Sequence, residues 1–165
     1  KEAIKALFST PPADNKLFSL QRRMVYINHV LKHGAVAHEF RVRLFNRNLA
    51  TWTTDAVHED LNYPSSCQVS KLPGFLWHHS YYSEEEHRQR LEKYAQLSAR
   101  QMFLSGKKAS VIKRFISPVF HFVQNFIFRL GFLDGLPGYQ FAKNEMWYTR
   151  RKYDLLHAGT NVSPS

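Results

Sequence analysis

The chain has 165 residues, of which 44% are hydrophobic and 22% are charged, a composition typical of one globular domain with its own core rather than of a disordered protein. Lys and Arg number 23 against 13 Asp and Glu, so the formal net charge of +10 predicts an anionic partner such as nucleic acid, acidic lipid or a phosphorylated small molecule. Because Cys67 is the single cysteine, an internal disulfide is excluded, and we expect a buried, inert thiol.

The first half of the chain predicts one short helix followed by strands. Residues 1–9 look like the end of a helix that stops at Pro11 and Pro12. In residues 40–47, Phe40, Val42 and Leu44 point one way and Arg41, Arg43 and Phe45 the other, which is the period of two of a half-buried strand. Strands are predicted at residues 17–27, 40–47, 50–54 and 69–82, with a turn at 46–48 that pairs the second with the third and a bend near Pro73 and Gly74 in the fourth.

The second half of the chain predicts helices. Ser83 is placed to cap a long helix, and Glu86 occupies the capping-box position. A second helical region is predicted over residues 110–130, with an interruption at Pro118, and a third helix over residues 139–156 before a frayed tail. This order of a helix, strands and then helices predicts a mixed α/β or α+β domain.

Residues 111–132 are rich in apolar and aromatic side chains but do not predict a membrane span. A span needs about 20 mostly apolar residues, and basic and amide side chains interrupt this stretch. No acidic residue occurs from Lys93 to Leu133, whereas basic residues recur there. The stretch is therefore either a core helix or a helix that lies in a membrane interface, with Lys and Arg at anionic headgroups, and the two combine if one face packs inward.

Most motifs of known sites are absent from the sequence. His29, His33 and His38 are spaced like metal ligands, as is the pair His78 and His79, but the single cysteine and the lack of HExxH speak against a zinc site. The chain has no GxxxxGK[ST] phosphate loop, no GxGxxG and no GxSxG elbow. It also has no signature of a nucleic-acid-binding fold, and we expect no nucleic acid among its partners.

One acidic cluster stands out in this basic chain, within the segment TTDAVHEDLNYP at residues 53–64. It consists of Asp55, His58, Glu59 and Asp60. Two interpretations are open from the residues alone: the cluster is a polar turn after a strand, or it carries chemistry.

Short motifs along the chain match, in order and spacing, those of a known family. They are Arg43-Leu44-Phe45, Val57-His58-Glu59, His78 with Ser80-Tyr81 and Ser83, Ala99, Gly106-Lys107, Pro118, and Gly131-Phe132-Leu133-Asp134-Gly135 with Gly138. Together they resemble the C-terminal part of bacterial family 2 glycosyltransferases of the type that act in lipopolysaccharide core biosynthesis. The resemblance runs from about Leu17 to Lys152, and it is the order of the pieces that is specific rather than any one piece.

The resemblance implies a GT-A fold, in which a Rossmann-like half holds a nucleotide sugar and an acceptor half follows. This chain would be the acceptor-side α/β part over residues 1–83 and a basic, amphipathic helical tail over residues 84–165. Family members hold a divalent metal, Mg or Mn, on an upstream DxD-type motif, but no two aspartates here lie two positions apart. Because the chain also starts at Lys1 rather than Met, we expect a fragment that is inactive alone, with the metal bound mainly by the missing half and no certain metal ligand in this chain.

The resemblance also implies the chemistry and the site. A sugar would pass from a nucleotide-sugar donor, with a UDP-sugar expected, to a lipopolysaccharide-core or similar glycolipid or oligosaccharide acceptor, with inversion at the anomeric carbon. Glu59 matches the family's His-Glu pair and is the candidate general base, Asp60 is the second candidate, and His58 would orient the acid or contact the donor. The candidate substrate-binding residues are Arg43, Trp52 and His78. A cation stabilises charge on the leaving diphosphate, and an aromatic ring can stack on a sugar face, although a core position suits the tryptophan equally.

The basic helices predict a location as well as a partner. We expect a cytoplasmic enzyme that is peripheral on the inner face of the plasma membrane, where a lipid-linked acceptor lies. The alternative is a non-enzymatic, basic module that binds a membrane surface or a protein partner, in which Glu59 has no role.

Overall fold

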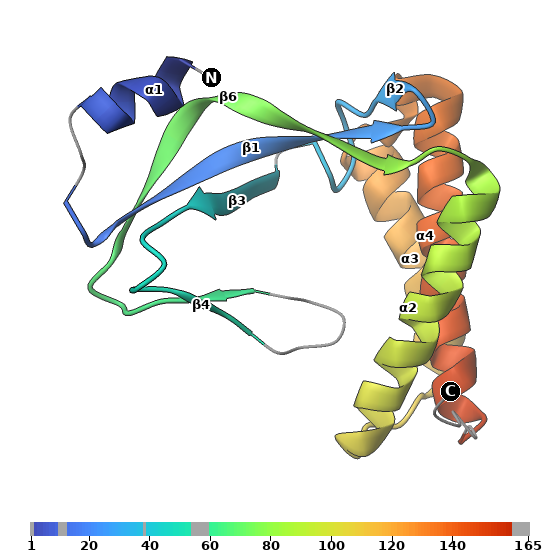
Figure 1. Ribbon diagram of the computed structural model, residues 1–165. Helices are drawn as coiled ribbons and strands as arrows, with labels where there is room; N and C mark the ends of the chain where they lie inside the picture. The colour runs from blue at the N-terminus through green and yellow to red at the C-terminus, as the bar shows by residue number, and fades with distance from the viewer. Residues whose placement is uncertain (1, 10–12, 38, 54–59, 160–165) are drawn as a thin grey trace. The chain divides into compact units, whose positions relative to one another are not determined.

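The computed structural model describes residues 2–9, 13–37, 39–53 and 60–159 (Figure 1). The chain divides into two compact units, Lys1–Arg23 with His38–His78 and Met24–Ala37 with His79–Ser165. The division falls within two long strands, β1 (Lys16–Tyr26) and β6 (Gln68–Tyr81). The expected parts 1–83 and 84–165 refer to halves of a longer protein and stay a prediction.

Strand β1 is the centre of the main sheet. It pairs antiparallel with β2 (His29–Val30) and with β3 (Glu39–Leu44), and β6 also pairs with it. Hydrogen bonds join Gln68 N to Asn15 O (3.0 Å) and Ile27 N to Tyr81 O (2.9 Å). The starts of β1 and β6 therefore meet, as do their ends, so the two strands run in the same direction (Figure 1).

The strands predicted at residues 17–27, 40–47 and 69–82 are confirmed by β1, β3 and β6. The helix predicted at residues 1–9 is confirmed by α1 (Glu2–Ser9). Strand β6 continues through Pro73 without a break, and the expected irregularity is confined to Gly74, whose φ of 97° is one that other residues rarely adopt.

The predicted pairing of residues 50–54 with the strand at 40–47 is wrong. Instead β4 (Thr51–Trp52) pairs antiparallel with β5 (Leu61–Asn62) in a separate small sheet. The turn itself forms, because Leu49 N donates to Asn46 O at 3.0 Å. Strand β3 instead forms its backbone hydrogen bonds with β1, whose buried apolar residues favour a long pairing.

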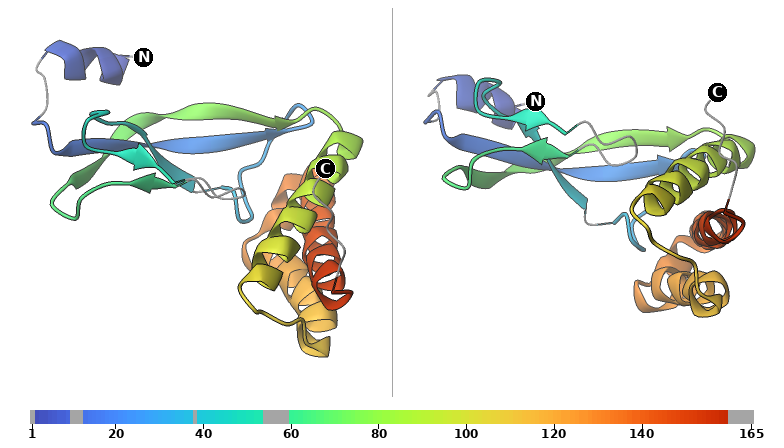
Figure 2. Two further views of the ribbon diagram at one scale, coloured as in Figure 1. Left: turned by 60° about the horizontal axis from the view of Figure 1, so that its bottom comes forward. Right: turned by 90° about the horizontal axis from the view of Figure 1, so that it is seen from below.

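The three long helices belong to the second unit. They are α2 (Glu84–Leu104), α3 (Val111–Val123) and α4 (Gly135–His157). Helix α4 contacts both other helices, and an end-on view shows it between them (Figure 2). On α2 the buried residues recur every four positions, at His87, Leu91, Ala95 and Ala99. Small residues in this row let α4 approach closely.

The predicted start of the first long helix is confirmed. The Ser83 side chain accepts a hydrogen bond from Glu86 N at 3.0 Å, while the Glu86 carboxylate accepts one from Tyr82 N at 2.9 Å. The helix thus satisfies its first backbone donors through the side chains that the capping-box pattern predicts.

The predicted interruption at Pro118 is wrong, because α3 continues through it. Proline removes one backbone hydrogen bond from the helix, but this turn is held against α4, with Pro118 buried and Arg114 bonded to Asp154 at 3.0 Å. The helix changes only later, at the π-helical turn η1 (Gln124–Phe128) and the 3-10 turn η2 (Gly131–Asp134).

The last helix, predicted at 139–156, starts earlier, at Gly135. Pro137 favours this start, since proline has a helical φ and needs no donor in the first turn. Within the part of the chain that the structure describes, no helix has both the length and the apolar character that a bilayer crossing requires. The protein is a mixed α/β fold, a small sheet followed by a helical region.

Candidate functional site

Two of the predicted substrate-binding residues, Arg43 and Trp52, lie together. The Arg43 guanidinium carbon lies 5.6 Å from the centre of the Trp52 ring, and Phe45 meets the same ring edge-on with centroids 6.0 Å apart. Trp52 remains 47% exposed. The tryptophan is therefore not a core residue: it is an exposed aromatic surface held by a cation and a second ring.

Asp60 is fixed in the small hairpin next to this ring. Its backbone pairs with Thr53, through Thr53 N to Asp60 O at 2.9 Å and Asp60 N to the Thr53 hydroxyl at 2.8 Å. One carboxylate oxygen accepts from Leu61 N at 3.0 Å. This is a local side chain-to-backbone bond, and it leaves the second carboxylate oxygen for another role.

The other predicted catalytic residues, His58 and Glu59, lie outside the described residues, as does Asp55. His78 is half-buried near the end of β6. Strand β1 separates β6 from β3 in the sheet. The structure therefore groups Arg43 with Trp52 and places His78 on a strand that is not adjacent to theirs.

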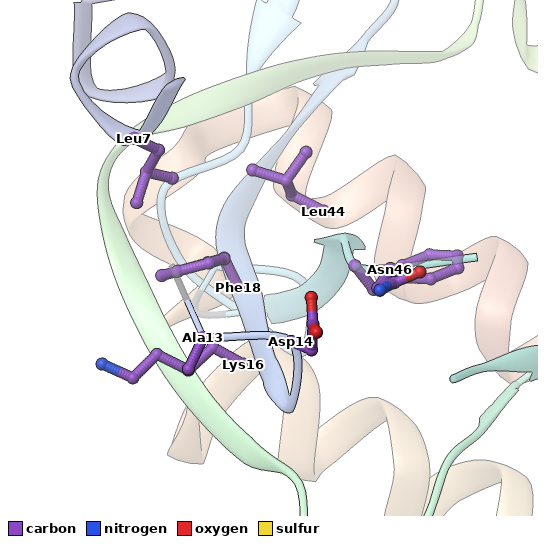
Figure 3. Close-up of a pocket in the computed structure, with 8 residues that line it drawn as sticks. Leu7, Ala13, Asp14, Lys16, Phe18, Leu44 and Asn46 are labelled. Carbon is purple, nitrogen blue, oxygen red and sulfur yellow. The ribbon is translucent and has the colours of Figure 1, made fainter. Parts of the chain in front are cut away.

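A cavity of about 170 Å³ lies beside Phe45 in the same unit (Figure 3). Its walls come from α1, the loop before β1, β1 itself and the end of β3. They include Leu7, Ala13, Asp14, Lys16, Phe18, Leu44, Phe45 and Asn46. Figure 3 shows the Lys16 amine pointing away from the other labelled side chains. The cavity is well below the roughly 300 Å³ at which ligand pockets begin, so it would take part of a substrate at most.

The described residues offer no group of three or more His, Cys, Asp or Glu side chains that could hold a metal ion. His33, one of the spaced histidines, is bonded to Asp134, with Nδ1 2.9 Å from the carboxylate. His79 stacks on the ring of Tyr82. The described residues therefore offer no metal site of their own, the metal expected on an upstream half stays a prediction, and no step is assigned to a metal here.

The GFLDG part of the motif forms a structural junction. One Asp134 oxygen accepts from Lys32 N at 3.0 Å and from His33 N at 2.9 Å, and the other lies 2.9 Å from His33 Nδ1. The carboxylate is only 7% exposed. It ties the loop after β2 to the turn before α4, assisted by a bond from Gly34 N to Arg129 O at 2.9 Å.

Glycines in this junction are required by close backbone contacts. A Cβ at Gly138 would lie 2.1 Å from Gly131 O, and one at Gly131 would lie 2.6 Å from Asn125 O. The turns η1 and η2 therefore pack backbone to backbone on the first turn of α4. The motif pieces from Gly131 to Gly138 hold the fold rather than the reacting groups.

A buried polar cluster in the second unit was not foreseen. His87 is fully buried and lies 3.3 Å from the Tyr26 hydroxyl and 3.2 Å from the Asn144 amide. Tyr81 packs on the His87 ring at 3.9 Å, and burial raises the pKa of Tyr81 to about 12. A signal was present in the sequence, because His87 stands four positions before Leu91, in line with Ala95 and Ala99 on one face of the predicted helix. His87 and Asn144 are both 0% exposed. The cluster therefore joins β1 to α2 and α4 rather than binding a substrate.

Comparison with known proteins adds no identity: no family model matches the chain, and no solved structure matches it.

Proposed function

We propose that this chain is the acceptor-side part of a family 2 glycosyltransferase with a GT-A fold, which transfers a sugar from a nucleotide-sugar donor to a lipopolysaccharide-core or similar glycolipid acceptor. The ordered motifs are the basis of the proposal. The observation that supports it is the exposed Trp52 ring on β4, which the Arg43 side chain of β3 contacts, and Trp52 lies seven positions before Glu59 in the sequence.

In the proposed reaction, the acceptor hydroxyl oxygen forms a bond to the anomeric carbon as the bond to the diphosphate oxygen breaks. The hydroxyl proton passes to the Glu59 carboxylate, and the nucleoside diphosphate leaves with the bonding electron pair. A carboxylate is already ionised at neutral pH, so position matters more than a shifted pKa. Asp60 is the weaker candidate because one of its oxygens is bonded to Leu61 N.

Arg43 and Trp52 are proposed to bind substrate. The Arg43 side chain donates one hydrogen bond, from Nη1 to Val42 O at 3.1 Å, and a guanidinium carries five donors. Its remaining donors suit a diphosphate that gains charge as it leaves. The exposed face of Trp52 suits the apolar face of a sugar ring. The divalent metal that the resemblance implies would be held by the upstream half and is given no step here.

The test is turnover of nucleotide sugars by the longer protein that the resemblance implies, with Glu59→Gln and Asp60→Asn as a matched pair. General-base catalysis contributes roughly 10²–10⁴-fold, so Glu59→Gln should reduce kcat by at least a hundredfold at unchanged thermal stability, and Asp60→Asn by less than tenfold. Equal activity of Glu59→Gln and the unmodified protein would contradict the proposed base.

The second candidate function is a non-enzymatic module that binds a membrane surface. The apolar side chains that α3 exposes favour it. It predicts that no nucleotide sugar is turned over and that Glu59→Gln changes nothing, so the same pair of variants separates the two candidates.

A further inference from the structure

Helix α3 presents a row of large apolar side chains to solvent. Ile112, Ile116, Val119 and Phe120 recur at the spacing of one helical face and are 56–64% exposed. The other side of the helix faces inward, where Pro118 is buried. One face of this helix therefore packs on the protein, as a core helix would, and the opposite face is open, as a helix in a membrane interface requires.

The exposed apolar row continues beyond α3. Ile127 in η1 is 49% exposed and Phe128 is 73% exposed. We call Ile112, Ile116, Val119, Phe120, Ile127 and Phe128 the apolar face. Soluble proteins rarely leave so many large apolar side chains open unless they meet a partner or a membrane.

Exposed lysines flank this apolar face. Lys107 and Lys108 lie in the turn before α3, and Lys113 lies one helical step from Ile112. None of the three is in an ion pair with another described residue. From Lys93 to Leu133 the sequence has no acidic residue. The charged side chains that this stretch contributes are therefore all basic, and one of them, Arg114, is paired with Asp154 of α4.

The turn before α3 also contains a recess. It measures about 270 Å³ and is lined by Phe103, Lys107, Lys108 and His157, among others. The two lysines at its edge lie four and five positions before Ile112 in the sequence. An anionic group can therefore enter beside the start of the apolar face.

We propose that α3 lies in the interface of an anionic bilayer, with the apolar face in the acyl boundary and Lys107, Lys108 and Lys113 at lipid phosphates. A bilayer supplies both requirements at once, hydrocarbon for the apolar row and negative charge beside it, to a depth of about 5–10 Å. A protein partner would need carboxylates matched to each lysine and a complementary shape. Lysines beside an apolar row fit a bilayer better, because a bilayer needs no such match.

Binding to a bilayer would deepen the proposed function, because a glycolipid acceptor lies in a membrane. Only this link to the acceptor rests on the proposed function. Lipid binding needs neither donor nor base. A chain with Glu59→Gln should therefore bind vesicles as the unmodified chain does, and loss of transfer activity would leave the lipid proposal intact.

The experiment is co-sedimentation of the 165-residue chain with vesicles of phosphatidylcholine alone or with 30% phosphatidylglycerol (about a third, enough for a negative surface potential). Ile112→Ser with Phe120→Ser should lower the partition coefficient roughly fiftyfold on anionic vesicles. The matched control is Val69→Ser with Trp77→Ser, which removes side chains that are 44% and 53% exposed on β6 and should change it less than threefold. Circular dichroism verifies folding of each variant.

The charge arm uses Lys107→Gln with Lys108→Gln. At about 1 kcal/mol per lysine near the surface, binding should fall roughly twenty- to thirtyfold on anionic vesicles and stay unchanged on neutral ones. Binding that depends on the lysines but not on Ile112 and Phe120 would overturn insertion. Concentration-dependent self-association that Ile112→Ser abolishes, without vesicle binding, would overturn the lipid surface and assign the face to a second copy.

Discussion

The Asp134 junction allows a sharp prediction from its hydrogen-bond geometry. Replacing Asp134 by Ala removes the acceptor for Lys32 N at 3.0 Å, His33 N at 2.9 Å and the His33 ring nitrogen at 2.9 Å. The carboxylate is 7% exposed, so water enters its position poorly. The loop after β2 would then lose its main polar attachment to η2.

The magnitude follows from the two backbone bonds. A hydrogen bond to a charged acceptor contributes about 1.5–3 kcal/mol. Water can replace part of this because the His33 side chain is 32% exposed, so we expect a loss of about 2–3 kcal/mol in the free energy of unfolding. For a chain of this size, 1 kcal/mol shifts Tm by about 2–4 °C, and Asp134→Ala should lower Tm by about 5–10 °C.

The assay is thermal unfolding followed by circular dichroism, with amide hydrogen exchange at Lys32 and His33 as the local measurement. Asp134→Asn is the matched control. Its carbonyl oxygen can still accept from both backbone donors and its amide can face the ring nitrogen, so a Tm loss of less than half that of Ala is expected. If Asp134→Ala unfolds within 1 °C of the unmodified chain (about 0.3–0.5 kcal/mol) and leaves both amides protected, the junction does not stabilise the fold.

Three further predictions concern other parts of the molecule. Gly138→Ala should lower the free energy of unfolding by at least 1–3 kcal/mol, because the new Cβ would lie 2.1 Å from Gly131 O. Gly106→Ala, at a φ of 70° with open space around it, should lower it by only about 1 kcal/mol. Thermal unfolding that ranks the two variants the other way would contradict the packing argument. Arg151 donates to Glu92 and lowers the pKa of Glu92 below its ordinary value of 4.5. The pair therefore stabilises the folded state above pH 4.5, and this stabilisation is lost as the pH falls through the folded pKa. The Tm difference between Arg151→Gln and the unmodified chain should shrink toward zero on acidification, and a constant difference would refute the role of this pair. In the longer protein, Glu59→Gln should reduce sugar transfer by at least a hundredfold at constant Tm, which product formation from a nucleotide sugar measures.

Local patterns in the sequence predicted the elements well. The strand at residues 40–47 and the capping box at Ser83 depend on near neighbours, and both appear in the structure. The candidate site was only partly accessible in this way. Arg43 and Trp52 were named separately, and their contact joins β3 of the main sheet to β4 of the small sheet, which depends on tertiary structure.

What the sequence determined by itself is the main helices and strands and the apolar and cationic character of residues 93–133, because these follow from periodicity and composition. Tertiary structure alone decided that β4 pairs with β5, that α3 passes through Pro118 and that Asp134 holds the loop after β2. These outcomes depend on partners far apart in the chain, and packing against those partners outweighs the local preference of a turn or a proline. It also decided which face of α3 stays exposed, since a periodic apolar helix does not by itself indicate which of its sides another helix covers.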